Sequence, residues 1–433
     1  MAGTGFPSPA ALRNGDVDLI AHVQTICDRI DAEDSLIQAL LPEPARRQRL
    51  TGEAEALLAR YPDPEERPPL FGLLVGVKDF FRVNGFPTKA GSKLPAALFE
   101  GAESDVVTRL RENGALIAGK TVTTEFAYFQ PGPTRNPHNT EHTPGGSSSG
   151  SAAGVAAGFY PLALGTQTIG SVIRPAAFCG IIGFKPSYDR INTDGMLFFS
   201  KSVDHAGVFS QDVATMKLVC FALFGSWDDS ECAPPDGLPA LAVPDGPYLE
   251  EAEEVGLQHF EETLDRLAAE GFRIERIPFF PDYADLNTRH RRLTAVEVAQ
   301  VHKQWYREYS DRYSVHMHEI MRTGATVSDE ERDDIRADQL LLRHAMEEAL
   351  LSAGADLWIA PAATGPAPHG IHATGNPIMN LPWTNAGVPA LAIPTGEAGD
   401  GLPLAVQFCG PFGADERLLA WGGAIEARVR GIA

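Results

Sequence analysis

Apolar residues recur at every third or fourth position in the first part of the chain, which is the period of an α-helix. The pattern is clear in DVDLIAHVQTICDRI (residues 16–30) and continues in PARRQRLTGEAEALLARY (residues 44–61). We therefore expect residues 1–70 to be mainly helical. The next segment, LFGLLVGVKDF (residues 70–80), is a short apolar run that contains a Lys-Asp pair near its end. Such a run is typical of a buried strand whose end meets a functional site.

Strands and helices then alternate along the chain. SDVVTRLRENG (residues 104–114) predicts a compact helix with Ser104 as its N-cap, and ALIAGKT (residues 115–121) predicts the next strand. The alternation resumes after Asp212 and ends in a helical pattern over residues 415–429. Regular alternation of this kind predicts a layered α/β fold.

The chain contains no interior linker long enough to separate two domains, so we expect residues 1–433 to form a single domain. Its parts are the N-terminal helices at 1–70 and a core at about 71–225 and 355–433. Residues 286–353 have a mostly helical pattern and carry much of the charge. We expect this segment to form a helical side layer or cap.

The charge balance limits the classes of partner. The sequence contains 57 Asp and Glu residues and 36 Lys and Arg residues, which gives a net charge of −21. We therefore expect no nucleic acid to bind. The sequence has no apolar run of about 18 residues, so we expect no membrane span, and its first residues do not resemble a signal peptide. The few cysteines are scattered, which favours reduced thiols and a cytoplasmic location; they are Cys27, Cys179, Cys220, Cys232 and Cys409.

The stretch TPGGSSSGSAAGVAAG (residues 143–158) has the composition of a flexible linker, but its Ala-rich second half predicts a helix. It contains G-x-S-x-G at 146–150, the pattern of a nucleophile elbow, which would make Ser148 the nucleophile of a hydrolase. That pattern needs a preceding strand. The residues before it, TRNPHNTEHTPG, are polar and rich in proline and therefore predict a loop. We disfavour the elbow on this ground.

The residues His138 to His142 match H-x-x-E-H, a zinc-site pattern. The pattern requires a helix, so that both imidazoles share one face. Pro137 and Pro144 bracket the motif and prevent a helix of useful length. We therefore expect exposed loop histidines, no metal and no cofactor.

A third serine, Ser171, follows a strand predicted at Leu162–Leu164 and a glycine-punctuated turn. Serine on such a turn is usually a turn residue or a cap. The same position also suits a nucleophile, because consecutive backbone N–H groups of the turn can converge on a developing oxyanion. These groups belong to Thr168, Ile169, Gly170 and Ser171.

Several long segments, taken in order, resemble the amidase signature family of serine hydrolases. GGSSSGSAAGVAAGFYPLALGTQTIGSVIRPAAFCGIIGFKPS (residues 145–187) is similar to the family's signature almost end to end. The likeness includes PLFGLLVGVKDFFRVNGFPTKAGS (69–92), KSVDHAGVFSQD (201–212) and NLPWTNAGVPALAIPTG (380–396). It spans most of the chain except about 286–353. The resemblance implies an α/β fold with a central mixed β-sheet covered by helices on both faces.

The resemblance also implies a Ser–Ser–Lys triad. The nucleophile falls on Ser171, the bridging serine with a cis peptide bond on Ser147, and the base on Lys78. The implied oxyanion hole is the turn Thr168 to Ser171. The chain departs from the family pattern where Gln167 replaces Asp, Ile169 replaces Gly, and Arg174 stands one place later than the usual arginine. These departures bear on the packing around the turn.

A lysine can act as the base only when it is neutral, which requires a pKa below the ordinary value of about 10.4. Burial among the apolar residues of its segment lowers that pKa, because desolvation disfavours the ammonium.

The resemblance implies carboxamides as substrates, and also some anilides, esters, ureas and carbamates. We expect Tyr128 and Phe129 to line the acyl side of the pocket. Three aromatic residues of the helical segment 286–353 are candidates for the leaving-group side of the pocket: Trp305, Tyr306 and Tyr309. Trp383 is a further candidate near that side. No arginine is evident for a substrate carboxylate, which favours a small uncharged amide or carbamate.

Two alternatives stay open. One is the glutamine amidase subunit of a tRNA-dependent amidotransferase complex, in which a partner chain would hold the tRNA. The other is a scaffold or binding protein of the same fold that has lost its triad; the complete set Lys78, Ser147 and Ser171 disfavours it. The expected oligomeric state is a monomer or homodimer.

Overall fold

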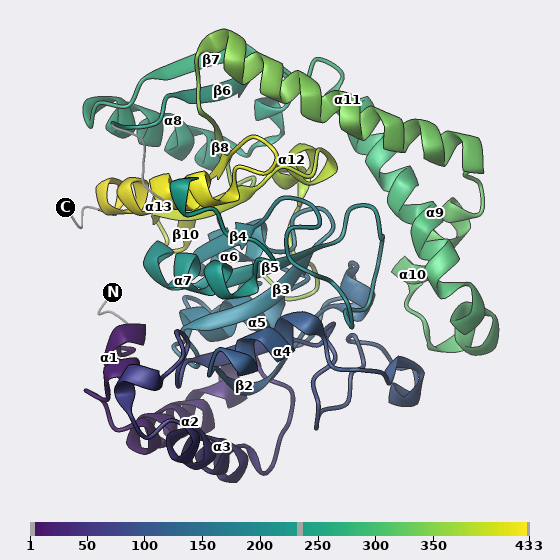
Figure 1. Cartoon of the computed structure of the whole chain (residues 1–433). Coiled ribbons are helices and arrows are strands. Elements are labelled where there is room, and N and C mark those ends of the chain that lie inside the picture. The colour runs from purple at the N-terminus through teal and green to yellow at the C-terminus, as the bar shows by residue number, and fades with distance from the viewer. Residues whose placement is uncertain (1–4, 232–236, 431–433) are drawn as a thin grey trace.

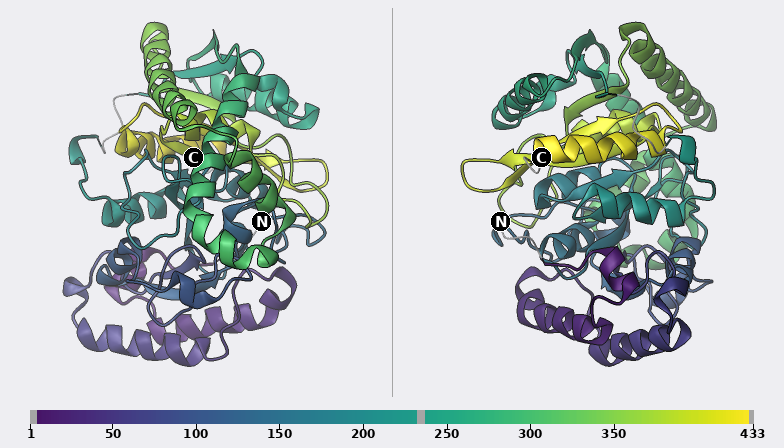
Figure 2. Two further views of the ribbon diagram at one scale, coloured as in Figure 1. Left: turned by 90° about the vertical axis from the view of Figure 1, so that its right-hand side faces the viewer. Right: turned by 60° about the vertical axis from the view of Figure 1, so that its left-hand side comes forward.

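The structure, a computed structural model, describes residues 5–231 and 237–430. Its centre is a mixed sheet of ten strands in the order β2-β1-β3-β5-β4-β9-β10-β8-β6-β7 (Figure 1). The sheet, with helices packed around it (Figure 2), confirms the predicted α/β fold. The strands are β1 (Leu74–Lys78), β2 (Leu116–Thr121), β3 (Leu162–Gln167), β4 (Ile182–Lys185), β5 (His205–Ser210), β6 (Leu241–Asp245), β7 (Ile274–Pro278), β8 (Leu357–Pro361), β9 (Ala390–Glu397) and β10 (Pro403–Cys409).

Parallel pairing at one end of the sheet positions the candidate site. β1 is parallel to both β2 and β3, with Lys78 opposite Thr121 and Val77 opposite Leu164. The carboxyl ends of these three strands therefore lie at one edge of the sheet, where sites of α/β folds commonly form. β3 continues to Gln167, beyond the Leu162–Leu164 core predicted from the apolar run, because it pairs with β5 along its whole length.

The helices surround this sheet (Figure 2). The N-terminal helices pack beside β2, and the helices of the charged segment form a layer along one side of the molecule (Figure 1). The helices are α1 (Pro9–Asn14), α2 (Leu19–Ile37), α3 (Arg46–Arg60), α4 (Asp105–Glu112), α5 (Ser149–Ala156), α6 (Ile173–Cys179), α7 (Val213–Leu223), α8 (Glu254–Ala269), α9 (Tyr283–Tyr309), α10 (Val315–Gly324), α11 (Asp329–Ala353), α12 (Leu381–Asn385) and α13 (Asp415–Val429).

Helices α9 to α11 occupy the segment predicted to be helical, and α9 begins slightly earlier, at Tyr283. Ser104 occupies the N-cap position of α4, as predicted, and its carbonyl accepts the backbone N–H of Thr108 at 3.0 Å. Its hydroxyl makes no capping bond and instead donates to the carbonyl of Gly195, 2.7 Å away. The side chain of Ser104 therefore ties the start of α4 to the loop 192–195.

One hydrophobic core cluster extends from Leu12 in α1 to Ile425 in α13. Cys27, Cys179, Cys220 and Cys409 are buried with free thiols, and Cys232 lies outside the described residues. None of the helices in the described part of the chain combines the length and the apolar character that a membrane span requires.

Candidate active site

Lys78 ends β1 with its side chain fully buried. Its Nζ lies within hydrogen-bonding distance of three hydroxyls, at 2.8 Å from Ser147 Oγ, 3.0 Å from Ser148 Oγ and 2.6 Å from Thr166 Oγ1. In the described residues no carboxylate forms an ion pair with Lys78. Burial lowers the pKa of Lys78 well below its ordinary value, and the nearby charge of Asp204 opposes this only in part.

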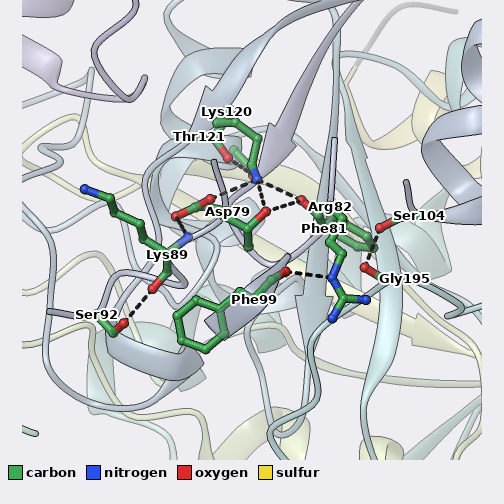
Figure 3. A network of polar contacts seen from close by, with 12 residues as sticks. Asp79, Phe81, Arg82, Lys89, Ser92, Phe99, Ser104, Lys120, Thr121 and Gly195 are labelled. Carbon is green, nitrogen blue, oxygen red and sulfur yellow. Dashed lines mark hydrogen bonds and ion pairs between the residues drawn. The ribbon is translucent and has the colours of Figure 1, made fainter. Parts of the chain in front are cut away.

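A second buried lysine fixes the chain directly after Lys78. Lys120 Nζ lies 2.9 Å from Asp79 Oδ1 and donates to the carbonyl of Phe81 at 2.7 Å (Figure 3). The Asp79 carboxylate also accepts a hydrogen bond from the backbone N–H of Lys89. Burial lowers the pKa of Lys120, but the adjacent Asp79 carboxylate works against this shift. The two buried lysines thus differ in their partners. Lys120 contacts a carboxylate, whereas Lys78 contacts hydroxyl groups.

The loop before α5 carries Ser147 toward Lys78. The Gly146–Ser147 peptide bond is cis, as the family resemblance implied. The carbonyl of Ser147 accepts from Thr123 Oγ1 at 3.0 Å, and Arg174 Nη2 donates to the carbonyl of Gly146 at 2.5 Å. Bonds on both sides of the peptide therefore hold Ser147 in place. No strand precedes Ser148 over residues 134–148, so the strand–turn–helix arrangement of a nucleophile elbow is absent from this described segment.

Ser171 follows β3 and lies in a pocket with Ser147. In the described chain, no hydrogen bond uses the N–H of Ile169, Gly170 or Ser171. These groups are therefore available to a ligand. The lining residues are Ala127, Tyr128, Phe129, Ser147, Thr168, Ile169, Ser171, Arg174, Phe199, Thr374 and Pro377.

The departures from the family pattern have local explanations. The Gln167 side chain accepts from the N–H groups of Val172 and Ile173, at 2.8 and 3.0 Å, and so caps the start of α6. Gly170 is required, because a Cβ there would lie 2.3 Å from Asn380 Oδ1. Ile169 stands where the family has glycine and keeps an unbonded N–H.

Arg174 lies in the pocket wall and does more than pack behind the turn. Its guanidinium is buried, and besides Gly146 it donates to the carbonyl of Gly375 at 2.6 Å and to Thr374 Oγ1 at 3.2 Å. Burial lowers its pKa to about 9. The arginine thus joins the loop before α5 to the loop at 374–375.

The aromatic candidates divide into two groups. Tyr128 and Phe129 line the pocket, and Phe199, which no sequence pattern singled out, stacks on Tyr128 with ring centroids 5.2 Å apart. Trp305 and Tyr306 are not among the lining residues.

Instead, Trp305 packs against Phe99, with ring centroids 5.1 Å apart, and Tyr306 bonds His318. Both pack against a hydrophobic cluster that also includes Tyr309 and that adjoins the pocket through Tyr128 and Phe199. Trp383 is fully buried, and its indole N–H donates to Tyr248. A role for Trp305 and Tyr306 on the leaving-group side stays a prediction.

The residues of the H-x-x-E-H motif form a loop, as predicted. The expectation that both histidines are exposed was wrong, because both are half-buried. His138 Nε2 lies 2.9 Å from the carbonyl of Cys179, and His142 Nδ1 lies 2.8 Å from that of Ala367. The two rings are thus fixed to different carbonyls.

Sequence reasoning missed two groups beside the site. Thr166 lies on β3, one residue before Gln167, and contacts Lys78. Asp204 lies on the loop before β5, where its carboxylate accepts from Thr168 Oγ1 at 2.5 Å and from the N–H of Phe199 at 2.6 Å. Burial raises the pKa of Asp204 to about 7. Both residues fall within segments that resemble the family, so the resemblance was the signal available for finding them.

Comparisons with known proteins match the sequence and the fold over nearly the whole chain. The family described as Amidase matches residues 21–419. The chain is 30% identical to a glutamyl-tRNA(Gln) amidotransferase subunit of Exiguobacterium sibiricum, with 92% of each chain covered. It is 33% identical to the corresponding subunit of Salinibacter ruber over 62% of this chain, and the match spans only 55% of that protein.

A solved structure described as that of an amidase superimposes with a TM-score of 0.86 at 31% identity, covering 97% of this chain and 98% of that one. Sequence and fold agree over nearly the whole length, and the chain therefore belongs to the amidase (amidase signature) family.

Proposed function

We propose that this protein is a serine hydrolase that cleaves the C–N bond of small uncharged amides through an acyl-enzyme on Ser171. The observation that carries the proposal is the contact between the buried amine of Lys78 and the hydroxyl of Ser147, 2.8 Å apart, beside a pocket that Ser171 also lines. A serine hydroxyl needs a base to act as a nucleophile. Lys78 serves as that base because burial favours its neutral form.

The proposed reaction begins with two proton transfers. Neutral Lys78 takes a proton from Ser147, and Ser147 takes one from Ser171 as the Ser171 oxygen attacks the substrate carbonyl. The carbonyl oxygen gains a negative charge, which the N–H groups of the turn 168–171 stabilise. Ser147 returns a proton to the leaving amine as the C–N bond breaks. Water then attacks the ester on Ser171 by the same route and releases the acid.

The pocket chemistry supports an uncharged acyl group. Tyr128, Phe129 and Phe199 supply aromatic surface. Arg174 is a cation in the pocket wall, and both of its terminal nitrogens donate to backbone carbonyls, which offsets part of its attraction for a carboxylate. Its Nε–H has no hydrogen-bond partner within the described residues, so substrates that bear a carboxylate test this assignment directly. Carbamates and esters share the reacting carbonyl and are secondary substrates in this proposal.

The test is a panel of amides, anilides, carbamates and esters with one shared chromophore, each prepared with a neutral acyl group and with a carboxylate-bearing acyl group. Neutral amides should give the highest kcat/KM. A consistent preference for the carboxylate-bearing set would contradict the uncharged assignment and point to Arg174 as its receptor. Labelling of wild-type protein at Ser171 by a fluorophosphonate separates an active triad from a scaffold that has lost its activity.

A second candidate is supported by the relatives, two of which are described as subunits of glutamyl-tRNA(Gln) amidotransferase. In that role the same triad would release ammonia from glutamine for a partner chain. Glutaminase activity that appears only with a copurifying partner would favour this candidate. Full amide turnover by the purified chain alone would favour the first.

A further inference from the structure

We infer that His290, together with Thr384, positions the turn 168–171 so that its N–H groups face the reacting carbonyl. The inference rests on the proposed function, because it concerns the proposed oxyanion hole. His290 belongs to α9, which lies in the segment without resemblance to the family signature. Neither side chain lines the pocket that contains Ser147 and Ser171, so both act through the carbonyls that they bind.

His290 is fully buried, and its Nε2 lies 3.1 Å from the carbonyl oxygen of Thr168. A carbonyl oxygen only accepts hydrogen bonds, so the Thr168 bond requires the tautomer with its hydrogen on Nε2. Nδ1 of the same ring lies 3.0 Å from Oδ1 of Asn385 in α12, and in this tautomer the Asn385 amide turns over so that its NH2 group donates to Nδ1. Gln339 in α11 donates to the Asn385 carbonyl at 3.2 Å. Three helices thus fix the orientation of the imidazole.

Thr384 fixes the next carbonyl of the turn, that of Ile169. Its hydroxyl donates to the carbonyl of Ile169 at 2.6 Å and accepts a hydrogen bond from the Gln167 side chain at 2.9 Å. The next carbonyl, that of Gly170, accepts the backbone N–H of Arg174 at 3.0 Å. Three consecutive carbonyls of the turn are therefore all bonded.

These bonds determine where the N–H groups point. A trans peptide unit is planar, so its C=O and its N–H point in opposite directions. Fixing the carbonyl of Thr168 therefore fixes the N–H of Ile169, and fixing the carbonyl of Ile169 fixes the N–H of Gly170. Within the described residues these N–H groups have no partner. Ile169 and Ser171 line the pocket.

Such control matters because a turn can reorient single peptide units. A reversed Thr168–Ile169 peptide would present a carbonyl oxygen to the developing oxyanion, and a donor would become a repulsive acceptor. Donors that are already oriented avoid this cost at the moment of reaction. The burial of His290 also strengthens its hydrogen bond to the Thr168 carbonyl, because the local dielectric is low.

Paired variants test the inference. His290→Leu and Thr384→Val each remove the donor, whereas His290→Gln and Thr384→Ser each retain one. The readouts are kcat and KM on the best amide of the panel and the rate at which a fluorophosphonate modifies Ser171. His290→Leu and Thr384→Val should each lower kcat and the modification rate by about 10²-fold, the scale of a small misplacement at a reacting centre, and leave KM nearly unchanged. The donor-retaining variants should recover most of the loss.

His302 provides the matched control, because it is also buried on α9 but contacts Tyr313 and not the turn. His302→Leu should lower the free energy of unfolding without the selective loss in kcat. The inference is overturned if folded His290→Leu keeps the wild-type kcat, or if His302→Leu loses as much. If His290→Leu does not fold, the Thr384 pair decides in the same way. Wild-type protein that neither reacts with the fluorophosphonate nor cleaves any amide would instead overturn the proposed function.

Discussion

The amine of Lys78 lies closer to Thr166 Oγ1, at 2.6 Å, than to Ser147 Oγ, at 2.8 Å. A neutral amine has two hydrogens and one lone pair. Ser148 donates its own hydroxyl hydrogen to the Thr166 carbonyl at 3.2 Å, so its oxygen accepts from the amine. If Thr166 Oγ1 accepts the second hydrogen, the lone pair is left for the proton of Ser147. Thr166 and Ser148 would then orient the base.

Replacing Thr166 by valine should lower kcat/KM by about tenfold or less, because one hydrogen bond contributes about 1 kcal/mol. Thr166→Ser, which keeps the hydroxyl, is the control and should stay near wild type. Ser148→Ala should cost a similar small factor, whereas Ser147→Ala should remove nearly all amide hydrolysis. Steady-state kinetics on one amide measures all four variants. If Ser148→Ala were the inactive variant and Ser147→Ala active, the relay would belong to Ser148.

Ser171→Ala should abolish both turnover and fluorophosphonate labelling. The side chain is small, and the change removes one hydroxyl that makes no hydrogen bond within the described residues, so the unfolding midpoint in urea should stay close to wild type. Mass spectrometry of the labelled peptide gives the site. A label that persists on the Ser171→Ala protein at another serine of the pocket would reassign the nucleophile.

Much of the fold follows from local pattern. The buried strand that ends at Lys78 was recognisable because its apolar run is uninterrupted, and the strand–helix alternation after it predicted the layered sheet. The positions that bring Lys78, Ser147 and Ser171 together were not predictable from pattern alone. They depend on parallel pairing of β1 with β3, which joins residues far apart in the chain. For these residues the family resemblance provided the prediction.

The contributions of His290 and Thr384 illustrate what neither pattern nor resemblance reveals. A histidine in an amphipathic helix carries no sign of the carbonyl that it will bind. His290 reaches the Thr168 carbonyl only because α9 packs against α12. The aromatic residues of the same helix show the converse, since Trp305 looked suited to a substrate pocket and instead packs against Phe99. Side-chain identity suggests chemistry, but the packing of distant elements decides which groups meet.

Asp204→Asn should shift the pH dependence of activity. The carboxylate raises the pKa of Lys78, because a nearby negative charge favours the ammonium. Removing that charge should lower the pKa of Lys78 further, so the rising limb of kcat/KM should move to lower pH. The shift should be evident only where Asp204 is ionised in the wild type, above its pKa of about 7. Matched pH profiles of wild type and variant measure it.

The same substitution should change how stability depends on pH. Folded Asp204 binds its proton more tightly than the unfolded chain does, because burial raises its pKa from 3.8 to about 7. Its contribution to the free energy of unfolding is therefore present at low pH and is lost as the pH rises through 7. The free energy of unfolding, measured in urea, should fall less between pH 5 and pH 8 in Asp204→Asn than in the wild type. An equal decrease in both proteins would exclude Asp204 as the source.

The last prediction concerns Lys78 as the base. Only its neutral form is productive in the free enzyme, so kcat/KM on amides should rise with pH along a one-proton limb and then level off. The pKa of that limb should lie below the ordinary lysine value, because burial disfavours the ammonium. A limb at the ordinary lysine value would show that the titrating group is solvated and is therefore a different residue.

Substitution of Lys78 separates its role as a base from its role in packing. Lys78→Ala should remove most amide hydrolysis, since the amine leaving group needs the proton that returns through Ser147. Activated esters should lose less, because their leaving groups need little protonation. Lys78→Arg should not restore amide hydrolysis, since arginine stays charged and cannot accept a proton. Assays of matched amide and ester substrates across pH compare the wild type with the two variants. If Lys78→Arg hydrolysed amides as fast as the wild type, the Ser–Ser–Lys assignment would be wrong.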